Sequence, residues 1–141
     1  MTRAVRAIIS LLTFELFVRS VDYLTGDSYS ERRVEDNLSV PEVWGLFGLA
    51  AVFIVVLGLL SKRTGVVQAG CITAFSIYTM FAVQIFEFRM LPIPWPPEDT
   101  RLLTSHITFA GLWLLMALVI WWRAYIAKKC VDELDRKVQG E

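Results

Sequence analysis

Three ionisable residues interrupt the first apolar stretch of the chain at a spacing that a helix would align. Glu15, Arg19 and Asp22 are separated by four and then three positions, so a helix places them on one face. Glutamate four residues before arginine is the favourable order for a helical ion pair. An unpaired charge at the middle of a membrane helix costs roughly 2.5–3.5 kcal/mol. We therefore expect this stripe to face the interior of a helical bundle, where its charges can pair.

Further polar side chains are expected at the same depth. With a rise of about 1.5 Å per residue in a helix, Gln84 and Glu87 fall near the outer end of the third apolar stretch, and His106 falls in the first turns of the fourth. This arrangement predicts a polar, outward-facing pocket, for which the candidate residues are Glu15, Arg19, Asp22, Gln84, Glu87 and His106. Alternatively, the same residues are structural pairs and interfacial residues that hold a small bundle together.

His106 is the only histidine of the chain. An imidazole titrates near neutral pH, which suits proton handling, so a relay between His106 and Glu87 is one interpretation. The other is a hydrogen-bonded residue near a helix start. A single histidine with scattered carboxylates is a poor metal site, and the sequence contains no glycine-rich phosphate loop, nucleophile elbow or HExxH motif. We therefore predict no enzyme activity, catalytic residues, metal, cofactor or nucleic-acid binding.

Four apolar stretches must position these residues. Hydrophobic residues make up 55% of the chain and the mean hydropathy is +0.52. The stretches are residues 5–24, 43–60, 66–88 and 102–122, each close to the ~20 apolar residues that cross a bilayer as a helix. The short segment 61–65 permits only an antiparallel hairpin. The sequence thus predicts an all-α polytopic membrane protein, in which residues 1–141 form one domain, an antiparallel four-helix transmembrane bundle.

Two local features refine the second and third stretches. Pro41 stands where a helix can begin, just before the second stretch. Gly70 and Ala74 are four positions apart in the third stretch, a spacing that lets helix backbones approach closely in lipid. Close packing of helices is the simplest meaning of this small-residue pair.

The basic residues predict an orientation. With the N-terminus in the cytoplasm, the outer loops 25–42 and 89–101 hold four of the 14 Lys and Arg residues, Arg19 lies inside a span, and nine lie on the inner side: Arg3, Arg6, Lys62, Arg63, Arg123, Lys128, Lys129, Arg136 and Lys137. The positive-inside rule therefore places both termini, including the tail 123–141, on the cytoplasmic side of the inner membrane. Cys71 and Cys130 would then face a reducing compartment, where free thiols are expected.

The layout resembles two groups of small membrane proteins. RAIISLLTFELFVRSVDYLTG followed by WGLFGLAAVFIVVLGLL is similar to the DoxX-like type, a compact four-helix bundle whose first helix ends in a polar stretch before the outer loop. The size, the number of spans and the charged tail after WWR resemble short multi-span proteins of actinobacterial phages, some of which are regarded as holins. Neither resemblance carries a functional residue over to this chain.

Three functions remain open at this point. The first is a non-enzymatic protein that acts by assembly in the cytoplasmic membrane, as a holin-like protein would in the membrane of a host cell. The second is a DoxX-like accessory subunit of a larger membrane complex. The third is binding or transport of a small ligand through the polar pocket. The expected partners are the lipid bilayer and either further copies of the chain or a larger membrane protein.

Overall fold

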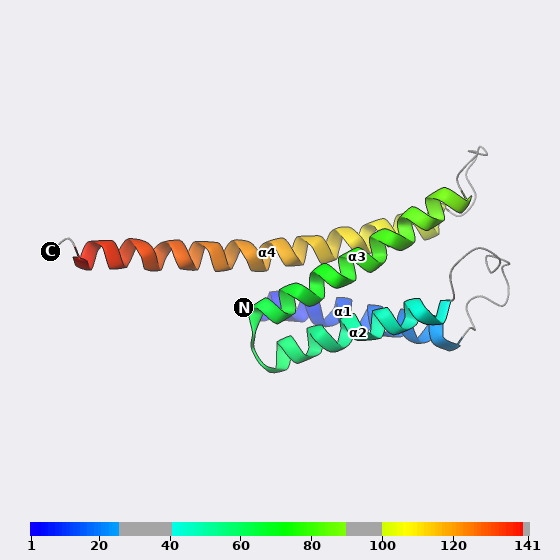
Figure 1. The fold of residues 1–141 in the computed structure, drawn as a ribbon, viewed down its shortest axis with the longest axis horizontal. Helices are drawn as coiled ribbons and strands as arrows, with labels where there is room; N and C mark the ends of the chain where they lie inside the picture. The colour runs from blue at the N-terminus through cyan, green and yellow to red at the C-terminus, as the bar shows by residue number, and fades with distance from the viewer. Residues whose placement is uncertain (26–40, 90–99, 140–141) are drawn as a thin grey trace.

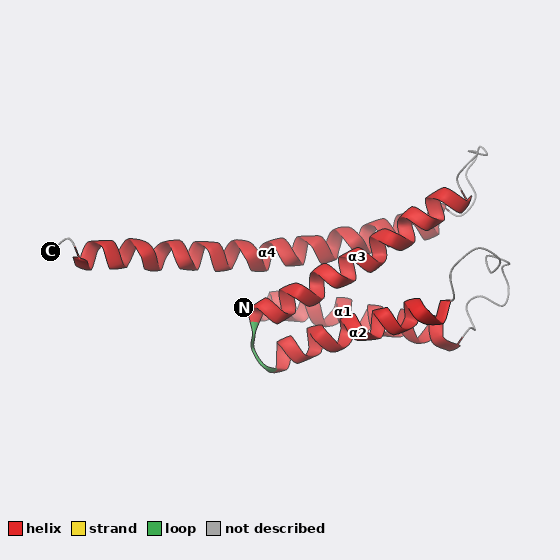
Figure 2. Ribbon diagram, in the orientation of Figure 1, coloured by secondary structure: helices red, strands yellow, loops and turns green. Residues whose placement is uncertain are grey.

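The computed structural model describes residues 1–25, 41–89 and 100–139. These residues form four α-helices: α1 (Arg3–Thr25), α2 (Pro41–Leu60), α3 (Thr64–Arg89) and α4 (Thr100–Gln139) (Figures 1 and 2). No strand occurs in these three segments. The prediction of an all-helical fold is confirmed. The ends of α1, α2 and α3 lie within two residues of the predicted stretches, and α2 begins at Pro41 as expected.

Three of the four helices are long and apolar enough to cross a membrane. Their candidate spans are Val43–Leu60, Thr64–Gln84 and Leu103–Arg136. Helix α1 is not among them, because Glu15, Arg19 and Asp22 interrupt its apolar sequence. The structure thus supports a membrane protein with three apolar helices. Whether α1 can also cross a membrane depends on the partners of its charged side chains.

The helices pack in chain order. Helix α1 lies along α2, α2 along α3 and α3 along α4, whereas α1 and α4 approach each other over only a short stretch. The N-terminus of α1 and the C-terminus of α2 share one end of the molecule with the start of α3 (Figure 1). The buried core takes side chains from all four helices, among them Ile9, Leu16, Val55, Tyr78 and Trp113. The packing of α1 on α2, and of α2 on α3, therefore places the polar residues of α1 near α3 and α4.

The turn between α2 and α3 makes an antiparallel hairpin. Lys62 adopts a left-handed backbone with a φ of 57°, and the amide of Arg63 donates a hydrogen bond to the carbonyl of Gly58 at 3.1 Å. This six-to-one bond after a left-handed residue is the Schellman termination of a helix. The chain therefore reverses within the three residues between α2 and α3.

Small residues set the distance between α2 and α3. A Cβ atom placed on Gly70 would lie 2.5 Å from Cγ2 of Val55 and 3.1 Å from its backbone nitrogen. Ala74, one turn further along α3, is fully buried. Only a residue without a side chain allows the α2 backbone to come this close. The close approach expected from the small-residue pair is therefore present at Gly70.

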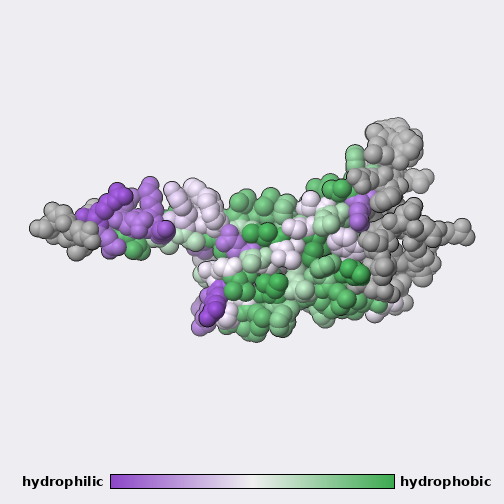
Figure 3. All heavy atoms as spheres, in the orientation of Figure 1, coloured by the Kyte–Doolittle hydropathy of each residue, from purple (hydrophilic) through white to green (hydrophobic). Residues whose placement is uncertain are grey.

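Helix α4 continues past the predicted span 102–122 into the charged tail. The tail sequence is compatible with a helix, and α4 runs without a break to Gln139. Every residue of 121–136 is exposed, and this segment projects alone beyond the bundle (Figure 1). Its sequence contains neither glycine nor proline, so nothing in it ends a helix. The surface changes from hydrophobic over the bundle to hydrophilic along the projection (Figure 3).

Candidate functional site

The centre of the candidate site is an ion pair on α1. Nη2 and Nε of Arg19 each lie 2.9 Å from Oε1 of Glu15, one helical turn earlier. The side chain of Arg19 is only 24% exposed and that of Glu15 only 27%, so both point toward neighbouring helices and away from the surface of the bundle. The pairing of Glu15 with Arg19 that the sequence indicated is present in the structure.

The guanidinium of Arg19 also reaches α4. It contacts His106 through Nη1, 3.1 Å from the imidazole Nε2, and Ser105 through Nη2, 3.4 Å from the hydroxyl oxygen. A guanidinium can only donate hydrogen bonds, so Nε2 of His106 accepts. The imidazole in this arrangement is therefore neutral and carries its proton on Nδ1. His106 is completely buried.

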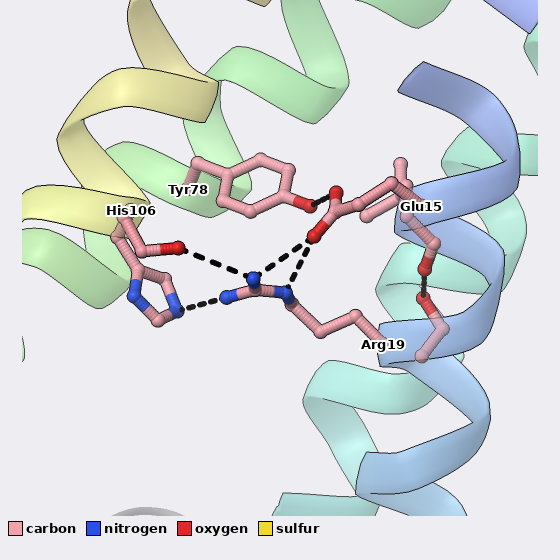
Figure 4. Close-up of polar contacts among 7 residues, drawn as sticks. Glu15, Arg19, Tyr78 and His106 are labelled. Carbon is pink, nitrogen blue, oxygen red and sulfur yellow. Dashed lines mark hydrogen bonds and ion pairs between the residues drawn. The ribbon is translucent and has the colours of Figure 1, made fainter. Parts of the chain in front are cut away.

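Helix α3 completes the cluster through Tyr78. Its hydroxyl donates a hydrogen bond to Oε2 of Glu15, the carboxylate oxygen that Arg19 leaves open. The guanidinium carbon of Arg19 lies 5.5 Å from the centre of the Tyr78 ring and 5.4 Å from that of Phe109 on α4. Both distances fall within the range of a cation–π contact. The labelled side chains of Figure 4 converge from three helices on this one guanidinium.

We call Glu15, Arg19, Tyr78, Ser105 and His106 the Arg19 network. Both carboxylate oxygens of Glu15 and all three nitrogens of the guanidinium have partners in it. Buried polar groups stabilise a fold when every member is satisfied and are costly when one is not. The network thus ties α1 to α3 and also to α4, which the α1 backbone approaches over only a short stretch.

Proton transfer is poorly served by this geometry. Nε2 of His106 faces a guanidinium, which keeps its protons at any physiological pH. Glu15 has its two oxygens occupied by Arg19 and Tyr78. A bound substrate would have to displace at least one of these contacts before it could exchange a proton with either residue. The arrangement suits a structural tie better than a general acid or base.

The described contacts of the network include neither Asp22 nor Gln84. Asp22 is exposed on α1. Gln84 is half-buried on α3, and its Oε1 has no hydrogen-bond partner among the described residues. The side chain of Glu87 lies outside the described part of the structure. The structure brings Glu15, Arg19 and His106 together, and the six-residue pocket and the relay between Glu87 and His106 stay predictions.

No protein-family model, curated protein or solved structure matches this chain. Evidence about the function of this chain therefore comes from its own sequence and structure. The described residues contain no group of three or more His, Cys, Asp or Glu side chains that could hold a metal ion.

The sequence prediction missed Tyr78, which supplies the second partner of Glu15. A tyrosine in the middle of an apolar helix carries a hydroxyl that needs a partner once it is buried. Tyr78 is 1% exposed, and the partly buried carboxylate of Glu15 on α1 is a suitable acceptor. The position of a tyrosine within an apolar stretch could have indicated a buried hydroxyl in need of a partner. The identity of that partner depends on the rotation of α1 and α3 about their axes.

Proposed function

We propose that this chain is a multi-pass protein of the cytoplasmic membrane that carries out no catalytic step and acts by assembling with further copies of itself. One observation carries the proposal. Helix α4 extends past the bundle, and the face that it buries inside the bundle continues, without a partner among the described residues, along the projecting part.

The buried face of α4 follows a regular spacing of four and three residues. Inside the bundle its members are His106, Ala110, Trp113, Ala117 and Ile120. The same spacing continues through Ala124, Ala127, Val131 and Leu134, which we call the α4 seam. Val131 is 55% exposed and Leu134 is 62% exposed. Such a heptad spacing is typical of helices that pair along an apolar seam.

A second copy of the chain is the partner that fits the seam. Copies inserted in the same orientation project their α4 helices from the same membrane face and in the same direction. Parallel pairing then sets Val131 opposite Val131 and Leu134 opposite Leu134 of the other copy. A β-branched residue at the first core position with leucine at the second favours two-stranded parallel pairing. Two heptads are marginal as a free peptide, but the membrane helices hold the segments together.

The proposal includes four membrane crossings, with both termini in the cytoplasm. The charged residues of α1 support a crossing, because Glu15 and Arg19 are paired with each other and with α3 and α4. Pairing within a bundle lowers the cost of such residues in lipid. The excess of Lys and Arg at the shared end of α1, the α2–α3 turn and the α4 projection supports the orientation. Reporter fusions after residue 63 and at the C-terminus should report the same cytoplasmic side. Opposite sides would contradict the topology.

Cysteine crosslinking tests the assembly. Cys130→Ser removes the exposed thiol, while Cys71 is buried. In that background Val131→Cys places a thiol in the seam, and Glu133→Cys places one two positions away, off the seam. In membranes treated with a mild oxidant, we expect a disulfide-linked dimer from Val131→Cys only, because core positions of paired helices come within the ~4.4–6.8 Å between Cα atoms that a disulfide needs. Equal crosslinking of both variants, or of neither, would contradict pairing through the seam.

The most specific form of the proposal is holin-like. The α1 and α4 backbones approach each other over only a short stretch, and the Arg19 network bridges them. Assembly that separated α1 from α4 would expose Glu15 and Arg19 and allow them to line a water-filled lesion. Inducible expression should then abruptly stop growth and collapse the membrane potential, and Leu134→Asp, which disrupts the seam, should delay both. Harmless accumulation in the membrane would contradict the holin-like form but leave self-assembly in place.

The α4 seam also bears on the accessory-subunit alternative. A larger membrane partner could bury Val131 and Leu134 in place of a second copy. Affinity purification from the native host would then recover a stoichiometric partner whose recovery is lost with Leu134→Asp, and Val131→Cys would form no homodimer. The crosslinking experiment therefore separates the two functions.

A further inference from the structure

A basic hollow lies at the end of the bundle where the chain enters α1 and where α2 turns into α3. Its volume is about 170 Å³. Arg6, Lys62 and Thr64 supply polar groups to its lining, and Met1 and Leu59 supply apolar surface. A protein cavity of about 150 Å³ holds a benzene molecule, so the hollow has room for a phosphate group.

The charges of the hollow are unbalanced. No carboxylate lines it, and among the described residues neither Arg6 nor Lys62 takes part in an ion pair. Arg6 is held in place by a hydrogen bond from Nη2 to the backbone carbonyl of Leu59 at 3.3 Å. The left-handed turn at Lys62 directs the chain into the start of α3 at Thr64. The positive end of the α3 dipole adds to the same potential.

We infer that the basic hollow binds the phosphate group of an anionic phospholipid. In the proposed topology, the ends of α1, α2 and α3 at this hollow lie at the cytoplasmic membrane surface, where lipid phosphates are found. Basic pockets between membrane helices on this side bind such headgroups. Arg6 and Lys62 contact the phosphate, and Met1 and Leu59 face the less polar glycerol part. The inference rests on the proposed membrane insertion and not on self-assembly.

Lipid retention by the full-length protein tests the inference. Wild-type protein in mild detergent is given equal amounts of phosphatidylglycerol and phosphatidylcholine, and bound lipid is counted by native mass spectrometry. We expect one phosphatidylglycerol to be retained in preference. Arg6→Gln with Lys62→Asn should lower its affinity by roughly 30-fold, since each basic residue near the surface adds about a fivefold effect. Asparagine is chosen at position 62 because it tolerates the left-handed backbone.

The matched control is Arg3→Gln with Arg63→Gln. It removes the same charge from the same end of the bundle, at two exposed residues that do not line the hollow. Preference for phosphatidylglycerol should survive in this control. An equal loss in both double variants would overturn the inference in favour of diffuse attraction, and no loss in either would overturn it as well. Because Arg6 also bonds α2, Lys62→Asn alone provides a second variant, with an expected loss of about fivefold.

A competition experiment distinguishes a lipid from a soluble phosphate compound. Inorganic phosphate and glycerol 3-phosphate are added to the phosphatidylglycerol complex. We expect neither to displace the lipid at millimolar concentration, because neither carries the acyl chains that keep it at the membrane surface. Displacement by either would overturn the lipid assignment and leave a soluble phosphate site at the same residues. If the wild-type protein shows no preference for phosphatidylglycerol but Val131→Cys still forms the dimer, only the lipid inference fails. If the dimer is absent but the preference remains, only the proposed assembly fails.

Discussion

Arg19 donates a hydrogen bond through Nη1 to Nε2 of His106, 3.1 Å away and 87 positions later in the chain. The bond joins α1 to α4, two helices whose backbones approach only briefly. It also fixes the neutral form of a fully buried imidazole. This pair of residues thus contributes to the connection between the first and last helices of the bundle.

Replacing His106 tests that connection. His106→Phe removes the acceptor and leaves one guanidinium donor of Arg19 unsatisfied, which should lower the stability of the detergent-solubilised protein by ~1–3 kcal/mol. His106→Gln offers a carbonyl oxygen in its place and should recover part of the loss. The measurement is thermal unfolding followed by circular dichroism. Thr108→Val, at an exposed position of the same helix, is the control and should change little. Equal stability of the phenylalanine and glutamine variants would contradict a role for the acceptor.

Tyr78 and Glu15 should be energetically coupled. Tyr78→Phe keeps the aromatic ring near Arg19 but leaves Oε2 of Glu15 without its donor, so we expect a loss of ~1–3 kcal/mol. Glu15→Gln weakens the same contact from the other side. In a double-mutant cycle, the combined loss should be smaller than the sum of the single losses by at least ~0.5 kcal/mol, as for residues in contact. Strict additivity would show that the hydroxyl and the carboxylate act independently.

The local parts of this fold follow from the sequence. Glu15 and Arg19 pair because four residues separate them on one helix, a relation that needs no knowledge of the other helices. Pro41 begins α2, and the short segment after Leu60 forms a tight hairpin. Each of these features depends on a few neighbouring residues, whose spacing alone decides the geometry.

The long-range contacts do not follow in this way. The bonds from Arg19 to His106 and from Tyr78 to Glu15 depend on the rotation of three helices about their axes, which apolar stretches of similar composition leave open. Depth in the membrane grouped Asp22 with the network, but its side chain is exposed. The charged tail after Trp122 is compatible with a helix because most of its residues are good helix formers, but composition alone does not show that α4 runs through it without a break.

Substitution of Gly70 should destabilise the protein more than substitution of Gly111. A methyl group on Gly70 would meet a side chain and the backbone of Val55 on α2, whereas one on Gly111 meets nothing within 4 Å. We expect Gly70→Ala to force α2 and α3 apart at a cost of ~1–3 kcal/mol. Gly111→Ala should be neutral or stabilise α4 by up to ~1 kcal/mol through helix propensity. Thermal unfolding of the two variants compares them directly, and a stable Gly70→Ala variant would contradict close α2–α3 packing.

Trp113 provides a test of how the bundle tolerates a buried polar atom. The indole is fully buried, and its Nε1 has no hydrogen-bond partner among the described residues. An unpaired buried donor costs ~1–3 kcal/mol. Trp113→Phe removes that donor together with part of the ring, so the gain offsets the lost packing and stability should stay within ~1 kcal/mol of the wild type.

Trp113→Ala separates packing from polarity at the same position. It also removes the donor but opens a cavity, and large aromatic residues replaced by alanine typically lose ~3–5 kcal/mol. Both variants are compared with the wild type by thermal unfolding in the same detergent. A loss in Trp113→Phe as large as that in Trp113→Ala would mean that Nε1 is engaged in the native protein. In that case His106 and Trp113, seven residues apart on the buried face of α4, would both anchor this helix through polar contacts.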